Sequence, residues 1–164
     1  MPVKNRITEF QPEIAGWRQD LHANPELHFD LPRTSAKVAA LLRDFGVDEI
    51  TEGVGKSGVV AVIKGRQTKS GRVIGFRADM DALPIIEATG LPHASTDAGK
   101  RRPRRHDGHT AVLLGAAKYL AETRNFDGTI VLAFQPAEED GTGARAMIAD
   151  GLMDRWGIQE IYGL

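Results

Sequence analysis

The sequence predicts an α/β fold with a mainly parallel sheet, because stretches with helical and with strand periodicity alternate along most of the chain. Three short runs rich in β-branched residues begin at Ser57, Val73 and Thr129, and stretches typical of helices precede or separate them. Alternating strands and helices favour a sheet flanked by helices, here a three-layer arrangement. The 164 residues suffice for one domain with its own core.

Two helices are predicted in the first part of the chain. Apolar residues recur at three- and four-residue spacing from Ile7 to Asn24, where Asn24-Pro25 ends the pattern. A second amphipathic stretch runs from Pro32 to Phe45, and Gly46 suits the position after the end of a helix. The connector between the two helices holds His28, which we interpret as a packing residue, like His22 on the first helix.

The middle of the chain is rich in predicted strands. Ser57–Lys64 and Val73–Ala78 read as buried strands, and the polar segment Arg66–Gly71 between them resembles a hairpin turn. A loop from Ala82 to Arg105 follows and contains three prolines. Loops of this length in a compact domain are usually functional or disordered.

The last part of the chain alternates regularly. The pattern predicts a strongly apolar helix over residues 107–124, a strand over Thr129–Phe134 and a short helix over Gly143–Leu152. A further strand begins at Ile158. This order again favours parallel pairing with helices as connections.

The composition excludes several classes of function. The formal net charge of −1 predicts no general attraction to nucleic acid or to an anionic membrane. The chain has no cysteine, which excludes disulfides and thiolate ligands. No window approaches the roughly 18 apolar residues of a membrane helix, and the first residues lack the apolar core of a signal peptide. We therefore expect a cytoplasmic protein without a membrane partner.

Two histidines open the strongly apolar helix. His106 and His109 are three residues apart, which places both imidazoles on about the same side of a helix. Imidazole is a common ligand of first-row metals, so a metal site is one interpretation. The alternative is capping and loop packing, with Asp107 as the helix cap.

Adjacent carboxylates follow the strand that ends at Phe134. Glu138 and Glu139 are expected at the carboxyl edge of the sheet, where ligands bind in open α/β folds. One carboxylate of such a pair can bind a cation while the other takes a proton from water. A solvated acidic loop is the alternative. Asp79 and Asp81 also follow a strand, and either orient a ligand or cap the next turn.

A basic run, Lys100 to Arg105, is the one compositional anomaly. Five cations interrupted by one proline suit weak contact with an anion or a nucleic acid. No aromatic residues are interleaved with these cations, so a nucleic-acid partner is not expected, although a non-catalytic anion-binding protein remains the alternative function.

Five motifs occur in a characteristic order. They are LHANPEL (Leu21–Leu27), RADMDALPI (Arg77–Ile85), EATGLPHAS (Glu87–Ser95), HDGHTAVLLGAAKYLAE (His106–Glu122) and FQPAEE (Phe134–Glu139). Together they resemble the metal-dependent amidohydrolases, the family that includes hippurate hydrolase, N-acyl-amino-acid amidohydrolase and the indoleacetyl-amino-acid hydrolases. The match extends over nearly the whole chain.

The resemblance implies hydrolysis of the amide bond of N-acyl amino acids with a divalent metal, namely zinc, manganese, cobalt or nickel. It implies that His106 and Glu139 are metal ligands and that Glu138 is the general base. The family fold joins an α/β catalytic domain to an inserted lid domain through which members often dimerise. Residues 1–164 correspond to the N-terminal part of the catalytic domain, a metallo-exopeptidase-like fold.

Two departures from the family pattern qualify this expectation. Arg104 stands where the family has a cysteine ligand, and a guanidinium does not coordinate metals. The family's lid domain and two further histidine ligands have no counterpart in the sequence. We therefore expect a truncated chain, weak or absent metal binding and no activity of the chain alone. The alternatives are a non-catalytic relic and an enzyme completed by a separate C-terminal half.

Overall fold

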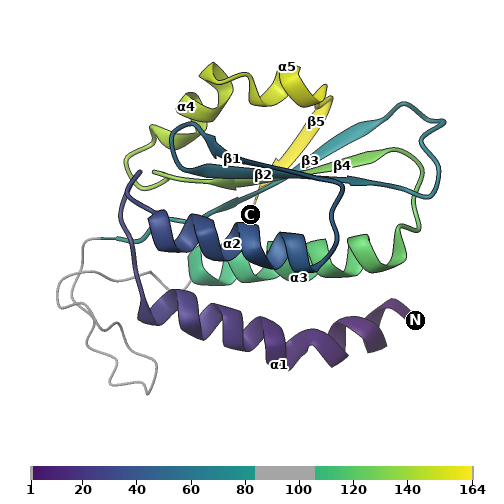
Figure 1. Ribbon diagram of the computed structural model, residues 1–164, viewed down its shortest axis with the longest axis horizontal. Coiled ribbons are helices and arrows are strands. Elements are labelled where there is room, and N and C mark those ends of the chain that lie inside the picture. The colour runs from purple at the N-terminus through teal and green to yellow at the C-terminus, as the bar shows by residue number, and fades with distance from the viewer. Residues whose placement is uncertain (1, 84–105, 164) are drawn as a thin grey trace.

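The computed structural model describes residues 2–83 and 106–163, with the side chains of residues 2–4 and of His106 excepted (Figure 1). The chain folds into one sheet with helices on both faces. In chain order the elements are α1 (Pro2–Ala23), α2 (Pro32–Asp44), β1 (Glu49–Val54), β2 (Gly58–Lys64), β3 (Val73–Asp79), α3 (His106–Thr123), β4 (Thr129–Gln135), α4 (Gly143–Ala149), α5 (Leu152–Trp156) and β5 (Glu160–Gly163).

The described strands form one five-stranded sheet in the order β1-β2-β4-β3-β5. β3 pairs in parallel with both β4 and β5, whereas β2 is antiparallel to its neighbours β1 and β4. Four of the five described strands therefore run in one direction and β2 runs against them. This arrangement confirms the predicted α/β fold with a mainly parallel sheet.

Helices cover the sheet in layers (Figure 1). α2 and α3 lie on one face, α4 and α5 lie on the other, and α1 packs on the outer side of α3. Successive side chains of a pleated strand point to opposite faces of the sheet. In β4, Leu132 and Phe134 belong to the core beneath α2 and α3, whereas Val131 and Ala133 belong to the core beneath α4 and α5.

The second helix has well-defined ends. Pro32 occupies its first turn, and the carboxylate of Glu26 accepts hydrogen bonds from the backbone N–H groups of Arg33 and Thr34 at 3.1 and 2.7 Å. Glu26 thus satisfies donors that a helix start leaves unpaired. Gly46 follows the helix with a φ of 72°, a left-handed conformation that glycine adopts without strain. The predicted stop at Gly46 is confirmed.

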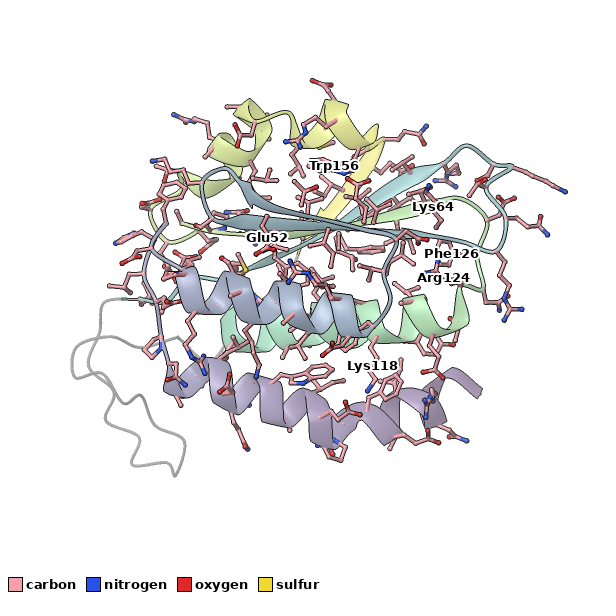
Figure 2. The ribbon with its side chains drawn as sticks, viewed as in Figure 1. Glu52, Lys64, Lys118, Arg124, Phe126 and Trp156 are labelled. Carbon is pink, nitrogen blue, oxygen red and sulfur yellow. The ribbon has the colours of Figure 1, made fainter. Side chains whose placement is uncertain are left out.

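A lysine joins the outer helix α1 to α3. The Lys118 ammonium lies 4.5 Å from the centre of the Phe10 ring and donates to both carboxylate oxygens of Glu13 at 2.6 and 2.7 Å (Figure 2). Its ring contact and ion pair hold the two helices together at a place where Phe10 is buried.

The strand β1 and the pairing of β2 were not predicted correctly. EITEGV, the sequence of β1, shows only a weak alternation because the strand is half exposed at the edge of the sheet. The segment Arg66–Gly71 does not close a hairpin, because β4 lies between β2 and β3. The predicted short helix over Gly143–Leu152 is present as α4, which ends at Ala149, and Leu152 begins a separate helix, α5. Of the predicted loop Ala82–Arg105, residues 84–105 lie outside the described residues.

Candidate active site at the carboxyl ends of the central strands

The candidate site forms where the parallel strands β3 and β4 end side by side. Asp79 is paired with Gln135 in the register of the two strands, and the Met80 N–H donates to the Gln135 carbonyl at 2.8 Å. The segment that comes after each strand therefore emerges at the same edge of the sheet. This edge is the usual place for ligands in open α/β folds.

Asp81 holds the loop that carries the glutamate pair. Its side chain is fully buried, and its two carboxylate oxygens face the backbone N–H groups of Glu138 at 2.9 Å and Glu139 at 3.4 Å. Hydrogen bonds to a charged acceptor are stronger than those between neutral groups. We expected Asp81 either to orient a ligand or to cap its own loop. In the structure it anchors the backbone of another loop, the one that follows β4.

The turn between β4 and the glutamates has an unusual backbone. Ala137 has a φ of 47° and is fully buried, a conformation that costs a non-glycine residue about 1–2 kcal/mol. Its N–H donates to the His28 carbonyl at 3.0 Å, and its carbonyl accepts the Gly143 N–H at 2.9 Å. A side chain at Gly143 would come within 1.6 Å of the Pro136 oxygen, so only glycine fits there. These contacts fix the direction in which Glu138 and Glu139 leave the sheet.

The end of β3 also anchors the first turn of α3. The Asp79 carboxylate lies 3.1 Å from Nδ1 of His109, and the Asp79 carbonyl accepts the Thr110 hydroxyl at 2.5 Å. Arg77 contacts the same carboxylate at 3.3 Å. Asp79 is almost fully buried, so these partners balance its charge. The start of α3 and the loop that carries Glu138 and Glu139 are therefore both held by residues at the end of β3.

A second buried carboxylate ties α3 to α1. Asp107 Oδ2 lies 2.9 Å from Nδ1 of His22 and 3.2 Å from Nε of Arg18, and both His22 and Asp107 are buried. Asp107 lies inside the first turn of α3, so it is not the residue before the helix that the interpretation as an N-cap required. Its Oδ1 does accept the backbone N–H of Gly108 at 2.7 Å, while Oδ2 contacts α1. His22 is buried, as predicted, and its ring is the polar partner of Asp107.

His28 also contributes to the site region, which its interpretation as a packing residue did not anticipate. Nδ1 of His28 lies 3.2 Å from the Asp140 carboxylate, next to the glutamate pair. Hydrogen bonds from Thr142, and then the charge of His28, hold the pKa of Asp140 below its ordinary value. The PEL segment that precedes His28 was the available sequence signal, since it belongs to the LHANPEL motif.

The predicted site residues are described to different extents. Glu138 and Glu139 are half-buried and come after the carboxyl end of β4, as expected. His106 begins α3, but its side chain lies outside the described residues, as do Arg104 and the whole run Lys100–Arg105. The roles of His106, Glu138 and Glu139 and the anion-binding alternative therefore remain predictions.

The side chains of the described residues do not complete a metal centre. Within residues 2–83 and 107–163, no three His, Asp or Glu side chains are grouped as metal ligands would be. Catalytic zinc sites use three protein ligands and an open position. Of the two ligands that the family resemblance implies, only Glu139 has a side chain among the described residues. None of the described helices is long and apolar enough to cross a membrane.

Comparison with known proteins identifies the family. The model of peptidase family M20/M25/M40 matches residues 75–164, more than half of the chain, so this protein belongs to that family. The chain is 47% identical over 96% of its length to hippurate hydrolase from Campylobacter jejuni. It is 40% identical over 98% of its length to N-acyl-L-amino acid amidohydrolase from Geobacillus stearothermophilus. Its relatives are hydrolases that act on amides.

A solved structure confirms the fold. The YxeP protein of Bacillus subtilis, described as a dinuclear metal-binding peptidase of the M20 family, superposes with a TM-score of 0.88 at 40% identity over 95% of this chain. The chain spans only 43% of that structure, 40% of the Campylobacter hydrolase and 43% of the Geobacillus amidohydrolase. The family resemblance drawn from the five motifs is therefore confirmed, for a chain about two-fifths as long as these relatives.

Proposed function

We propose that this chain supplies the carboxylate part of the active site of an M20 amidohydrolase that cleaves the amide bond of N-acyl amino acids such as hippurate. The anchoring of the Glu138–Glu139 loop by buried Asp81 carries the proposal. The buried Asp81 carboxylate holds two successive backbone N–H groups and so fixes the backbone that carries the partly exposed Glu138 and Glu139. Such fixed geometry is what acid–base catalysis requires.

The substrate class rests on the relatives. The names of the two curated relatives describe hydrolysis of hippurate and of N-acyl amino acids. Both substrates join an acyl group to an amino acid through an amide bond. The same chemistry is proposed here because the chain shares the glutamate pair and the histidine motif, HDGH, that the family resemblance assigns to it.

Glu138 is the proposed general base. Its carboxylate takes a proton from a water molecule, whose oxygen then attacks the amide carbonyl carbon. The proton passes to the amide nitrogen as the carbon–nitrogen bond breaks, which releases a carboxylic acid and a free amino acid. Glu139 and His106 are the proposed ligands of a divalent metal, and Arg104 takes the place of a third ligand.

The chain by itself is proposed to be inactive. Arg104 is a cation where the resemblance calls for a thiolate ligand, and a guanidinium does not coordinate metals. The part of an M20 domain that the chain does not span is the proposed source of further metal ligands, and its lid domain is where dimerisation is expected.

Metal content and turnover test this proposal together. We expect the dialysed chain to hold well under about one metal ion, because stable catalytic sites need three ligands. We expect no hippurate hydrolysis above buffer. Elemental analysis and release of glycine are the measurements, and one tightly held metal per chain contradicts the proposed defect.

Repair of the site gives the sharper experiment. The chain is fused to the part of the Campylobacter hippurate hydrolase that it does not span, with and without Arg104→Cys. We expect metal binding and hydrolysis only with the cysteine. Glu138→Gln in the repaired fusion should lower kcat by about 10²–10⁴-fold with the metal retained, since only the base is removed. Full activity in the fusion that keeps Arg104 contradicts the account of the site.

A further inference from the structure

The connector between α1 and α2 lies at the end of the sheet where β3 and β4 finish (Figure 1). Its backbone is bonded to the segment after β3, because the Ala82 N–H donates to the Glu26 carbonyl at 2.8 Å and Leu27 forms a parallel bridge with Ala82. The Asp30 N–H donates to the Leu27 carbonyl at 3.0 Å, which closes a turn that contains His28. The connector therefore fixes the position of His28.

His28 contacts the loop after β4 at two places, one on each side of the glutamate pair. Its carbonyl accepts the Ala137 N–H at 3.0 Å, and its Nδ1 lies 3.2 Å from Oδ2 of Asp140. Ala137 is the residue before Glu138, and Asp140 is the residue after Glu139. The two contacts of His28 therefore bracket the two glutamates.

The Asp140 carboxylate is also held from its own side. Its Oδ1 accepts the backbone N–H of Thr142 at 2.9 Å, which leaves Oδ2 to face His28. Exposed ion pairs are usually weak, because two mobile side chains must be ordered. The side chains of His28 and Asp140 are 48% and 36% exposed, but Thr142 holds one partner and the connector holds the other. Little further ordering is needed, which strengthens the contact.

His28 makes these contacts with an unfavourable backbone conformation. Its φ is 52°, in the left-handed region that glycine adopts freely and a residue with a Cβ adopts at a cost. A glycine at this position would keep the backbone contact to Ala137 but would offer no side chain to Asp140. The contact with Asp140 is therefore what the imidazole adds to the backbone contact.

We propose that His28 is a positioning residue for Glu138 and Glu139, whose imidazole holds the far end of their loop through Asp140 while Asp81 holds the middle. This inference rests on the proposed function, because a fixed loop matters to catalysis only if Glu138 is the base. A general base must lie within hydrogen-bonding reach of its water, and a displacement of about 1 Å lowers the rate.

Hydrogen exchange of the chain alone tests whether His28 acts on the loop or on the whole fold. His28→Gly removes the imidazole and relieves the left-handed backbone, so Tm should not fall. The Ala137 and Gly141 amides should nevertheless exchange about three- to fivefold faster, because the loop opens more often. The Leu132 amide, in the middle of β4, reports the whole fold and should not change. A role in stability alone would lower Tm and accelerate all three amides.

Two further variants separate the imidazole from the backbone. His28→Asn keeps a nitrogen at the place of Nδ1 and tolerates a left-handed φ, so it should restore loop exchange to within about twofold of the unsubstituted chain. Lys56→Gly is the matched control, since Lys56 also has a left-handed φ, of 80°, but lies in the turn between β1 and β2. It should leave the Ala137 and Gly141 amides unchanged.

A double substitution tests the route through Asp140. In an Asp140→Ala background, His28→Gly should have no further effect on the Ala137 and Gly141 amides, because the partner of the imidazole is already absent. An equal effect in both backgrounds overturns the proposal. Unchanged loop exchange in His28→Gly, equal acceleration of the Leu132 amide, or no recovery in His28→Asn overturns it as well.

Turnover gives a second readout in the repaired fusion. His28→Gly should lower kcat about three- to fivefold with KM and metal content unchanged, because the base is displaced and the ligands stay. An active fusion in which His28→Gly leaves kcat unchanged overturns the positioning role. The exchange measurements need no turnover, so an unsubstituted repaired fusion without hydrolysis refutes the proposed function and leaves the hold of His28 on the loop standing.

Discussion

Strands β4 and β5 lie on either side of β3 and both pair with it in parallel, yet they differ completely in burial. The last five residues of β4, from Val131 to Gln135, are buried, whereas all four residues of β5 are exposed. The backbone pairing is therefore not what buries a strand. β4 is covered because β2 continues the sheet on its far side and helices lie on both faces.

This difference in burial gives the two strands different roles. The buried β4 leads into a loop that is fixed, because Asp81 and the backbone contacts of Ala137 hold the residues after the strand. The exposed β5 lines two apolar cavities, one against α3 through Tyr162 and one against α4 and α5 through Ile161. The candidate chemistry therefore depends on the covered strand, β4.

Truncation of one aromatic side chain in each strand should give the largest contrast. Phe134→Ala should destabilise the chain by about 3–5 kcal/mol, because it removes a fully buried ring and leaves a cavity. Tyr162→Ala should cost about 0.5 kcal/mol or less, since most of that side chain already faces water. Urea unfolding of both variants makes the comparison, and equal losses would show that β5 is covered in solution.

Removal of the charge on Asp81 should have an intermediate effect. Asp81→Asn replaces one acceptor oxygen by an amide that faces the N–H of Glu138 or Glu139, so a buried donor loses its partner at a cost of about 1–3 kcal/mol. Asp154→Asn, at an exposed position of α5, is the control and should be neutral. Denaturant unfolding measures both changes. A neutral Asp81→Asn would mean that the glutamate loop is held by other contacts.

The smallest expected effect concerns the pKa of Glu160 in β5. The hydrogen bond from the Tyr162 hydroxyl, at 2.6 Å, and then the one from Arg72 hold the pKa of Glu160 below its ordinary value. A folded-state pKa below the unfolded value stabilises the fold above the unfolded pKa, and this contribution is lost as the pH falls through the folded pKa.

Tyr162→Phe should therefore raise the pKa of Glu160 toward the ordinary value of a glutamate. It should lower the free energy of unfolding slightly at neutral pH and leave it unchanged in acid, where Glu160 is protonated in both states. NMR titration of the Glu160 carboxyl carbon measures the shift, with Tyr119→Phe as the control on α3. An unchanged pKa in Tyr162→Phe would assign the effect to Arg72 alone.

The sequence by itself determined the class of the fold and most of the elements that carry the site. The periodicity of residues 129–134 and the apolar stretch after His106 are strong because both segments are buried, and burial is what a hydrophobic pattern records. The position of Glu138 and Glu139 after a buried strand was predicted from the same pattern. The five motifs were sufficient to indicate the family.

Only the tertiary structure decided which segments are neighbours. Nothing local in the sequence shows that β4 lies between β2 and β3, that Asp81 binds the loop after β4, or that His22 faces Asp107, because these partners lie 57 to 85 residues apart. A strand at the edge, such as β1, leaves a weak pattern because one side of it contacts water. Periodicity records whether a residue is buried, whereas the fold alone determines what buries it.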